Sequence, residues 1–255
     1  MHDTPTGLSC TSNHSFDRAR EGYVNLMPSG RLKGRIAGDS DEMIRARRAF
    51  FDNGHYLPIA RAVAAAVGTA EATLDAGCGE GFYLSQVSSG SRWGVDISKP
   101  AIKLAARRYG DINFAVGTSF HLPLPDHSLD AIVSVFAPRP FDEFARVLRP
   151  DGVVVVASPG PDHLRGLTDL IYETPEPHEQ RPHTNDATVS VTYDLSLGQP
   201  DITHLVQMTP YWWKATAMQQ ADIGRLEHLG VTIDVVVSTH RSLSPGNLPA
   251  EHVTP

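Results

Sequence analysis

The chain has 255 residues, of which 41% are hydrophobic, and a formal net charge of −7. This length and composition predict a globular protein with one substantial core and exclude a compositionally disordered chain. Two cysteines are too few for a disulfide framework. Because no apolar run reaches the ~20 residues of a membrane span and the first residues lack a signal segment, we predict a cytoplasmic protein with no membrane partner.

Charge is distributed unevenly along the chain. Residues 1–68 carry nine Lys/Arg and seven Asp/Glu, whereas the remainder carries 13 and 22. The acidic balance argues against a protein that coats nucleic acid in general, so a polyanion contact would involve the first quarter of the chain. A solvated loop followed by a solvated helix face is the simpler interpretation of such a charge run. The basic residues concerned are Arg31, Lys33, Arg35, Arg45, Arg47 and Arg48.

The first elements in chain order are a small lobe and two helices. Residues 1–30 are polar and turn-rich, which predicts a small folded lobe or arm. In "GDSDEMIRARRAFFDNGHYLPIARAVAAAVG", helical spacing begins after an N-cap at Asp39 or Ser40. Asn53 and Gly54 interrupt it before it resumes to Val67, so we expect two helices rather than one.

Strand and helix patterns then alternate. The strands predicted are "ATLDAG", "RWGVDIS", "INFAVGT", "LDAIVSVFA" and "GVVVVASPG", and the helices are expected from Gly81, from Pro100 through Arg108, and around residues 142–147. This alternation predicts an α/β fold, a mostly parallel sheet with helices on both faces. Beyond it, "YETPEPHEQRPHTND" indicates a mobile loop, "VTIDVVVSTHR" a final antiparallel strand, and residues 244–255 a disordered tail.

Three glycines follow the first of these strands in "LDAGCGEGFY". Gly77, Gly79 and Gly81 stand at alternate positions, where a chain that passes from strand to helix turns tightly against a ligand. Asp75 precedes the turn. Asp96 ends the next predicted strand, where a carboxylate can accept both hydroxyls of a ribose. The dinucleotide fingerprint G-x-G-x-x-G is not matched, which disfavours a nicotinamide-binding domain.

The glycine turn and the acidic strand end together resemble the class I S-adenosylmethionine-dependent methyltransferases. The resemblance covers about residues 70–160 and includes "TSFHLPLPDHSLDAIVS" and "VLRPDGVVVVASP". It implies a Rossmann-like sheet and S-adenosyl-L-methionine as the cofactor.

A more specific resemblance extends over about residues 10–241. It is carried in order by "HSFDRAREGYVNLMP", "GDSDEMIRARRAFFDNGHYLPI", "LDAGCGEGFY", "DISKPAIKLAARRY", "FAPR", "SPGPDHL" and "LVQMTPYWWKA". Together these look like the bacterial 23S rRNA guanine-N1 methyltransferases, which modify a guanine in hairpin 35. The resemblance implies 23S rRNA as the partner and allows a homodimer. A macrolide-resistance branch acts on a neighbouring guanine, and residues 38–56 look slightly closer to the housekeeping branch.

The N-terminal lobe departs from that family. The family has a zinc finger whose ligands are an early Cys-x-x-Cys and a later Cys-x3-His, and here Cys10 and His14 match only the later pair. Two protein ligands fall short of the four that a closed zinc site requires, so the sequence argues against a complete site in this chain. Two explanations are possible for the missing ligands, and we prefer a start codon assigned too far downstream over loss of the finger in this lineage. We predict a remnant zinc-finger-like RNA-recognition lobe and linker at residues 1–36 and a methyltransferase domain at 37–243.

The resemblance assigns cofactor contacts to Tyr56, Cys78, Gly79 and His163, and the general pattern adds Asp75, Gly77, Gly81 and Asp96. Other interpretations stay open. Tyr56 could anchor a helix junction, and His163 could cap a helix. Cys78 is interpreted as a small packing residue rather than a nucleophile, because "GCGEG" supplies no basic neighbour to form a thiolate.

Guanine N1 lies on the Watson–Crick edge, so a target base must be unpaired or flipped to react. Aromatic side chains then hold such a base by stacking. The candidates are Phe136, Trp212 and Trp213, each of which could instead belong to the core. Arg139 follows the fourth parallel strand, where this fold presents groups to its substrate, although a structural ion pair explains it equally. The sequence does not identify the general base.

Two further functional classes remain open at this point. A small-molecule methyltransferase would use the same cofactor domain, and the acidic core and the half-complete finger favour it mildly. A degenerate binding protein without activity is the other, and the intact glycine turn with Asp96 speaks against it.

Overall fold

The computed structural model describes residues 2–4, 6–10, 14–27, 40–176, 178, 187–241 and 243. Several expectations fall outside the described residues: the basic residues Arg31, Lys33 and Arg35, the boundary between residues 36 and 37, most of the predicted mobile loop, and the tail from residue 244.

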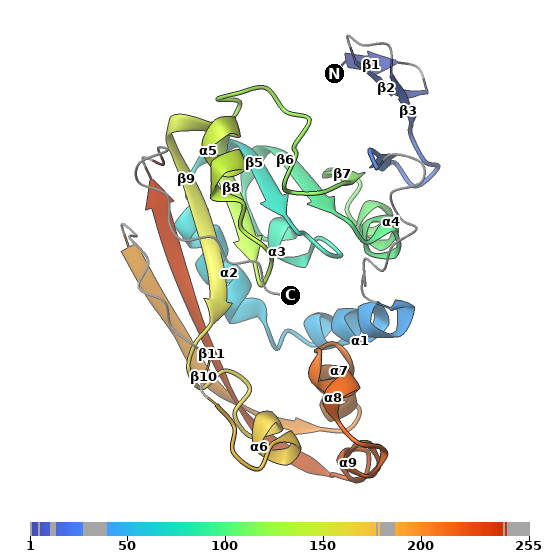
Figure 1. The fold of residues 1–255 in the computed structure, drawn as a ribbon, viewed down its shortest axis with the longest axis vertical. Helices are drawn as coiled ribbons and strands as arrows, with labels where there is room; N and C mark the ends of the chain where they lie inside the picture. Colours follow the sequence, from blue (N-terminus) through green and yellow to red (C-terminus); the bar gives the residue numbers. More distant parts are fainter. Residues whose placement is uncertain are drawn as a thin grey trace.

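The N-terminal lobe contains a small antiparallel sheet of three strands in the order β1-β2-β3. These are β1 (His2–Thr4), β2 (Gly7–Ser9) and β3 (Ser15–Asp17). The next strand, β4 (Val24–Asn25), leaves this sheet and pairs in parallel with β7 of the large sheet. The chain therefore passes from the small sheet directly to one edge of the main body (Figure 1).

The large sheet has eight strands in the order β10-β11-β9-β8-β5-β6-β7-β4. Every pairing from β9 through to β4 is parallel, whereas β11 pairs antiparallel with both β9 and β10. The strands are β5 (Ala70–Ala76), β6 (Ser89–Asp96), β7 (Asn113–Val116), β8 (Leu129–Val135), β9 (Leu148–Pro159), β10 (Ala187–Gly198) and β11 (His228–Arg241). This arrangement confirms the predicted α/β fold.

The expected pair of N-terminal helices is present. Helix α1 (Asp41–Asp52) begins at Ser40, whose hydroxyl accepts a hydrogen bond from the Met43 N–H, and α2 (Leu57–Val67) follows after Gly54, which has a φ of 79°. The remaining helices are α3 (Phe82–Ser85), α4 (Lys99–Arg108), α5 (Phe141–Val147), α6 (Leu167–Ile171), α7 (Asp201–Gln207), α8 (Tyr211–Lys214) and α9 (Ala217–Ile223).

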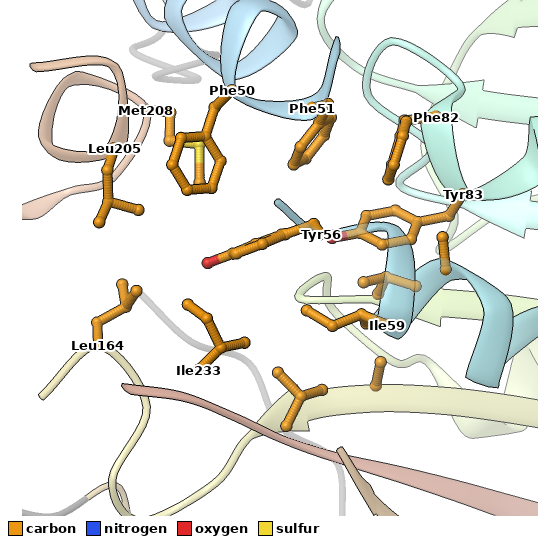
Figure 2. Close-up of a cluster of buried hydrophobic side chains, with 14 of the residues drawn as sticks. Phe50, Phe51, Tyr56, Ile59, Phe82, Tyr83, Leu164, Leu205, Met208 and Ile233 are labelled. Carbon is orange, nitrogen blue, oxygen red and sulfur yellow. The ribbon is translucent and has the colours of Figure 1, made fainter. Parts of the chain in front are cut away.

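Helices bury both faces of the parallel strands. On one face, α5 packs Phe141 and Phe144 against Ile132 of β8. On the other, the largest cluster brings together residues of α1, α2, α3, α7 and the C-terminal strands. Figure 2 shows this second cluster, in which Tyr56 lies between Phe51 of α1 and Ile59 of α2. The cluster joins the first helices to the sheet at the end where β5 turns into α3.

In the large sheet, sequence patterns alone missed two of the described strands. The long strand β10 was not predicted, although Val189, Val191 and Tyr193 alternate with polar residues, the pattern of a strand with one solvated face. It forms an antiparallel ladder with β11 over its whole length, from Ala187 opposite Thr239 to Gly198 opposite His228. Strand β4 is too short to give a periodic signal.

Candidate active site

Strand β5 ends in a tight turn with three glycines in the left-handed region. Gly77, Gly79 and Gly81 have φ angles of 87°, 53° and 82°, a region that side chains with a Cβ rarely adopt. Space is also lacking, because a Cβ on Gly77 would lie 2.5 Å from the Cβ of Ala137 and one on Gly81 would lie 2.9 Å from Cζ of Phe114. The turn therefore exposes backbone rather than side chains to a ligand.

Asp96, at the end of β6, is held against this turn. Its Oδ2 accepts a hydrogen bond of 2.8 Å from the N–H of Gly79, and its Oδ1 accepts one of 2.7 Å from the N–H of Ser98. The carboxylate is thereby fixed in orientation. Because a carboxylate oxygen can accept more than one hydrogen bond, Asp96 retains capacity for the hydroxyls of a ribose.

Unsatisfied polar atoms gather around the same turn. Six buried side-chain N or O atoms of the described residues have no hydrogen-bond partner, and five of them belong to Asp75, Glu80 and Tyr83. Asp75 is 1% exposed and Glu80 is 4% exposed. Buried polar groups are normally paired, so this concentration within nine residues indicates the place where a polar ligand supplies the partners.

The two carboxyl groups hold protons unusually tightly. Burial, with a smaller contribution from the charge of Asp96, raises the pKa of Asp75 to about 8. Burial raises the pKa of Glu80 to about 7, although the nearby guanidinium of Arg48 opposes the shift. A cationic group placed beside Asp75 would favour its ionised form. S-adenosyl-L-methionine carries ribose hydroxyls, an ammonium group and a sulfonium, so the residues present fit this cofactor.

Cys78 lies inside the turn but is unsuited to nucleophilic chemistry. Its side chain is buried, its Sγ donates weakly to the Gly79 carbonyl at 3.7 Å, and burial raises the pKa of the thiol. A Cβ on Gly94 would lie 2.8 Å from this sulfur, which shows how closely the turn packs against β6. The structure therefore supports the interpretation of Cys78 as a packing residue whose backbone lies in the turn.

Tyr56 stands at the junction of α1 and α2, directly before the first residue of α2. The junction is braced by the Tyr193 hydroxyl, which donates to the His55 carbonyl at 2.6 Å, and by Asp201, whose Oδ2 lies 2.7 Å from Nε2 of His55. The buried Tyr56 hydroxyl lies 3.5 Å from Nε2 of His163. Tyr56 therefore lies at the helix junction, as one interpretation predicted. Its hydroxyl also points toward His163, another residue predicted to contact the cofactor.

His163 and Phe136 form an aromatic wall beside Tyr56. The rings of Phe136 and His163 stack with centroids 5.6 Å apart, and the Phe136 and Tyr56 centroids lie 6.5 Å apart. His163 Nδ1 accepts from the Asp234 N–H at 3.3 Å, and burial lowers the pKa of the imidazole to about 4. The helix-cap alternative for His163 is wrong, because Gly166 is the N-cap of α6.

Phe136 combines two unusual properties. It is 42% exposed, and its φ is 51°, in the left-handed region that a phenylalanine seldom occupies. The strained residue follows β8 at the carboxyl end of the parallel sheet, where ligands bind in open α/β folds. Strain of this kind is typical of functional sites, so Phe136 fits the substrate-facing role expected from the sequence.

The other predicted substrate residues lie in different surroundings. Burial lowers the pKa of the Arg139 guanidinium, and no ion pair of this residue is found within the described part of the chain. Trp212 packs against the main core. Trp213 is 64% exposed, and its indole N–H points to Sδ of Met43 at 3.4 Å, at the start of α1. The two tryptophans therefore do not share one environment.

Several residues of this region were not predicted from the sequence as site residues. His178 lies near the wall, with its ring centroid 6.2 Å from that of His163, and its Nε2 is 3.5 Å from the Tyr211 hydroxyl. Two arginines of α1 also lie here. Nε of Arg48 is 3.9 Å from Oε2 of Glu80, and Nη1 of Arg47 is 3.9 Å from the position that a Cβ would take on Gly79. Arg47 and Arg48 belonged to a charge run, and only the three-dimensional position of α1 separates them from the solvated Arg45.

The N-terminal lobe brings the two expected metal ligands together. Cys10 Sγ lies 3.4 Å from Nδ1 of His14. Within the described residues, no group of three or more His, Cys, Asp or Glu side chains could hold a metal ion. The described donor set therefore does not fit a closed zinc site.

The strand order, the glycine turn after β5 and the fixed Asp96 at the end of β6 define a class I S-adenosylmethionine-dependent methyltransferase domain. A family model described as "Methyltransferase domain" matches residues 74–156, and a second, described as "RlmA, N-terminal", matches residues 1–33. No described helix is long and apolar enough to span a membrane.

Curated relatives narrow the identification, and the chain is a relative of the 23S rRNA (guanine-N1)-methyltransferases. It is 40% identical to a candidate enzyme of this kind from Micromonospora griseorubida over 66% of this chain and 63% of that protein. It is 37% identical to the 23S rRNA (guanine(748)-N1)-methyltransferase of Streptomyces fradiae over 64% of this chain and 61% of that protein. A third relative, YxjB of Bacillus subtilis, is 29% identical over 89% of this chain and 88% of that protein. The first two matches span less than two thirds of those relatives.

Proposed function

We propose that this protein transfers a methyl group from S-adenosyl-L-methionine to N1 of a guanine in hairpin 35 of 23S rRNA. The observation that carries the proposal is the aromatic wall of Phe136 and His163 beside the glycine turn and Asp96. The similarity to guanine-N1 methyltransferases names the base and the RNA.

The site has the parts that such a transfer requires. S-adenosyl-L-methionine supplies an already activated methyl group. The protein must therefore bind and orient the cofactor and the base and exclude water, and it need not form a covalent intermediate. Asp96 and the glycine turn hold the cofactor end of the pocket. Phe136, exposed at the carboxyl end of β8, offers a face on which a flipped guanine stacks.

His163 contributes an uncharged ring to the aromatic wall. Because its pKa is lowered to about 4, the imidazole is uncharged at neutral pH, and its Nδ1 is occupied by the Asp234 N–H. A neutral ring avoids a second positive charge next to a sulfonium. This also argues against His163 as the group that removes the N1 proton.

Arg139 fits the substrate side of the same region. A partly buried guanidinium without an ion pair in the described part of the chain is suited to the phosphate backbone beside the flipped base. Such a contact would position RNA without reading its sequence.

Primer extension across hairpin 35 tests the function. The RNA comes from a host that lacks its own guanine-N1 methyltransferase and expresses this protein, the Asp96→Ala variant or neither. A methyl on N1 blocks pairing, so we expect a reverse-transcriptase stop only with the unaltered protein. Its position identifies the guanine, and a stop at guanine 748 would match the activity named for the Streptomyces fradiae relative. Cofactor binding without a stop would overturn the RNA assignment and favour a small-molecule substrate.

A further inference from the structure

Trp213 of α8 is a large aromatic side chain that the fold leaves open to solvent. It is 64% exposed, whereas its neighbour Trp212 packs against the main core. Exposure alone does not mark a binding residue, since single apolar side chains are common on protein surfaces. The orientation of this ring and its place beside the pocket carry the argument further.

The Trp213 ring is held in position along one edge. Its indole N–H points to Sδ of Met43 at 3.4 Å. The short helix that carries it is fixed too, because the Trp213 N–H donates to the Pro210 carbonyl at 3.2 Å and the Gln220 side-chain amide donates to the Trp212 carbonyl at 2.9 Å. One edge of the indole therefore contacts the protein, and most of its surface stays available to a partner.

Helix α1 places Trp213 next to the cofactor pocket. Met43 and Arg47 are four residues apart, so their side chains lie on the same face of α1, ~6 Å apart along its axis. Nη1 of Arg47 lies 3.9 Å from the position that a Cβ would take on Gly79, and its Nη2 donates at 3.2 Å to the carbonyl of Met208, which ends α7. Figure 1 shows α7 and α8 directly beside α1. Trp213 is thus about one helical turn from the residue that lies over the glycine turn.

The charges around Trp213 are mixed. Lys214 follows it in α8, and Arg45 is exposed on α1. Asp41 and Glu42 stand in the first turn of α1, where acidic side chains complement the helix dipole. A surface with both signs gives little net attraction for phosphate. A contact with RNA at this point would therefore be made to the face of a base, which an indole binds without charge.

We propose that Trp213 stacks on an unpaired nucleotide next to the flipped guanine and so positions the RNA over the pocket. The inference deepens the proposed function and rests on it for the RNA substrate. A base that is flipped into a pocket brings its neighbours to the surface around the mouth, and proteins recognise unpaired RNA bases by stacking them on aromatic side chains. Phe136, at the carboxyl end of β8, remains the residue suited to the target base itself.

Binding of an RNA fragment that contains hairpin 35 tests the proposal. Trp213→Ala removes the ring, and Trp213→Phe keeps an aromatic face. The matched control is Met218→Ala, which removes an apolar side chain that is 73% exposed on α9. Dissociation constants are measured over a range of salt concentrations with S-adenosyl-L-homocysteine present, so that no methyl group is transferred.

We expect Trp213→Ala to raise the dissociation constant for RNA about 5- to 150-fold, the value of one stacked base. Trp213→Phe should recover most of the affinity, and Met218→Ala should leave it unchanged. Because stacking neutralises no phosphate, the slope of log affinity against log salt should be the same in Trp213→Ala as in the unaltered protein. No weakening by Trp213→Ala, equal weakening by both Trp213 variants, or a changed slope would overturn the proposal.

Tryptophan fluorescence and kinetics provide readouts that a purely structural role would not move. RNA should quench the emission of the unaltered protein, and Trp213→Phe should lose most of this quenching while it still binds RNA. Trp93→Phe should keep it, because Trp93 pairs with Leu74, which belongs to the cluster under α5 rather than under α1. Quenching that persists in Trp213→Phe would refute the stacked contact.

In methylation assays, Trp213→Ala should raise KM for RNA while kcat and the cofactor dissociation constant stay unchanged, since this ring does not contact the reacting atoms. A fall in kcat at unchanged KM would contradict a positioning role. Failure of the unaltered protein to bind the RNA would refute the proposed function together with this inference, whereas RNA binding that no Trp213 variant alters would refute the inference alone.

Discussion

Replacing Asp75 with asparagine should change how the stability of the cofactor-free protein depends on pH. The folded protein holds the Asp75 proton up to a pKa of about 8, whereas an unfolded chain releases it near 3.8. Between these values the unfolded state binds fewer protons, so the free energy of unfolding of the unaltered protein falls as pH rises. Asparagine has the same shape and does not titrate.

The size of the effect follows from the linkage slope. One pKa unit corresponds to about 1.4 kcal/mol, so the Asp75 contribution should fall by ~3 kcal/mol between pH 5 and pH 7. Other groups also contribute: Glu80 acts in the same direction up to about pH 7, and His163 acts oppositely below its ordinary pKa of 6.5. Both proteins contain these groups, so the difference between the two curves isolates Asp75.

The assay is urea unfolding of both proteins at intervals from pH 5 to pH 9, after dialysis to remove cofactor. The stability of the unaltered protein minus that of Asp75→Asn should decline up to about pH 8 and then level off. A difference that stays constant with pH would mean that Asp75 is ionised in the folded protein. That result would refute the reasoning about its unpaired, buried carboxyl group.

Other predictions concern the aromatic residues. Phe136→Ala should lower kcat/KM for RNA methylation about 5- to 150-fold, the value of one stacked base, with the cofactor dissociation constant little changed in calorimetry. Phe136→Gly should lose activity equally but raise the free energy of unfolding by ~1 kcal/mol, because glycine relieves the left-handed backbone; a loss of stability would contradict the strain. Phe51→Ala should destabilise the protein by about 3–5 kcal/mol in urea unfolding, since Phe51 stacks on Phe82 in the core; a change under 1 kcal/mol would show that α1 docks without it.

Local patterns in the sequence predicted the parallel sheet well. The predicted strands are bounded by turns, and the central ones, "LDAIVSVFA" above all, are apolar runs buried on both faces, so their positions follow from local signals. The glycine turn and Asp96 were also predictable, because a motif fixes a backbone conformation and the structure shows both held by short contacts. Their contact with the cofactor stays a prediction.

The sequence could not predict which distant segments come into contact in the fold. Arg47, His178 and Asp234 lie on α1, on the segment before β10 and on β11, and nothing in their immediate neighbours indicates that they converge on the carboxyl ends of β5 and β8. Trp213 was predicted as a candidate for stacking on the target base, yet its indole N–H points to Met43 at the start of α1. Such positions depend on helix docking, which no local periodicity encodes.

The C-terminal hairpin also governs when the site can form during synthesis. Asp234 of β11 orients His163 through its N–H, accepts from the Asp162 N–H at 3.1 Å and from the Thr192 hydroxyl at 2.9 Å, and leaves no room for a Cβ on Gly160. The glycine turn, Asp96 and Phe136 leave the ribosome much earlier. In a nascent chain halted before residue 234, His163 would lack the N–H that orients its ring, so the aromatic wall takes its final form only when β11 is made.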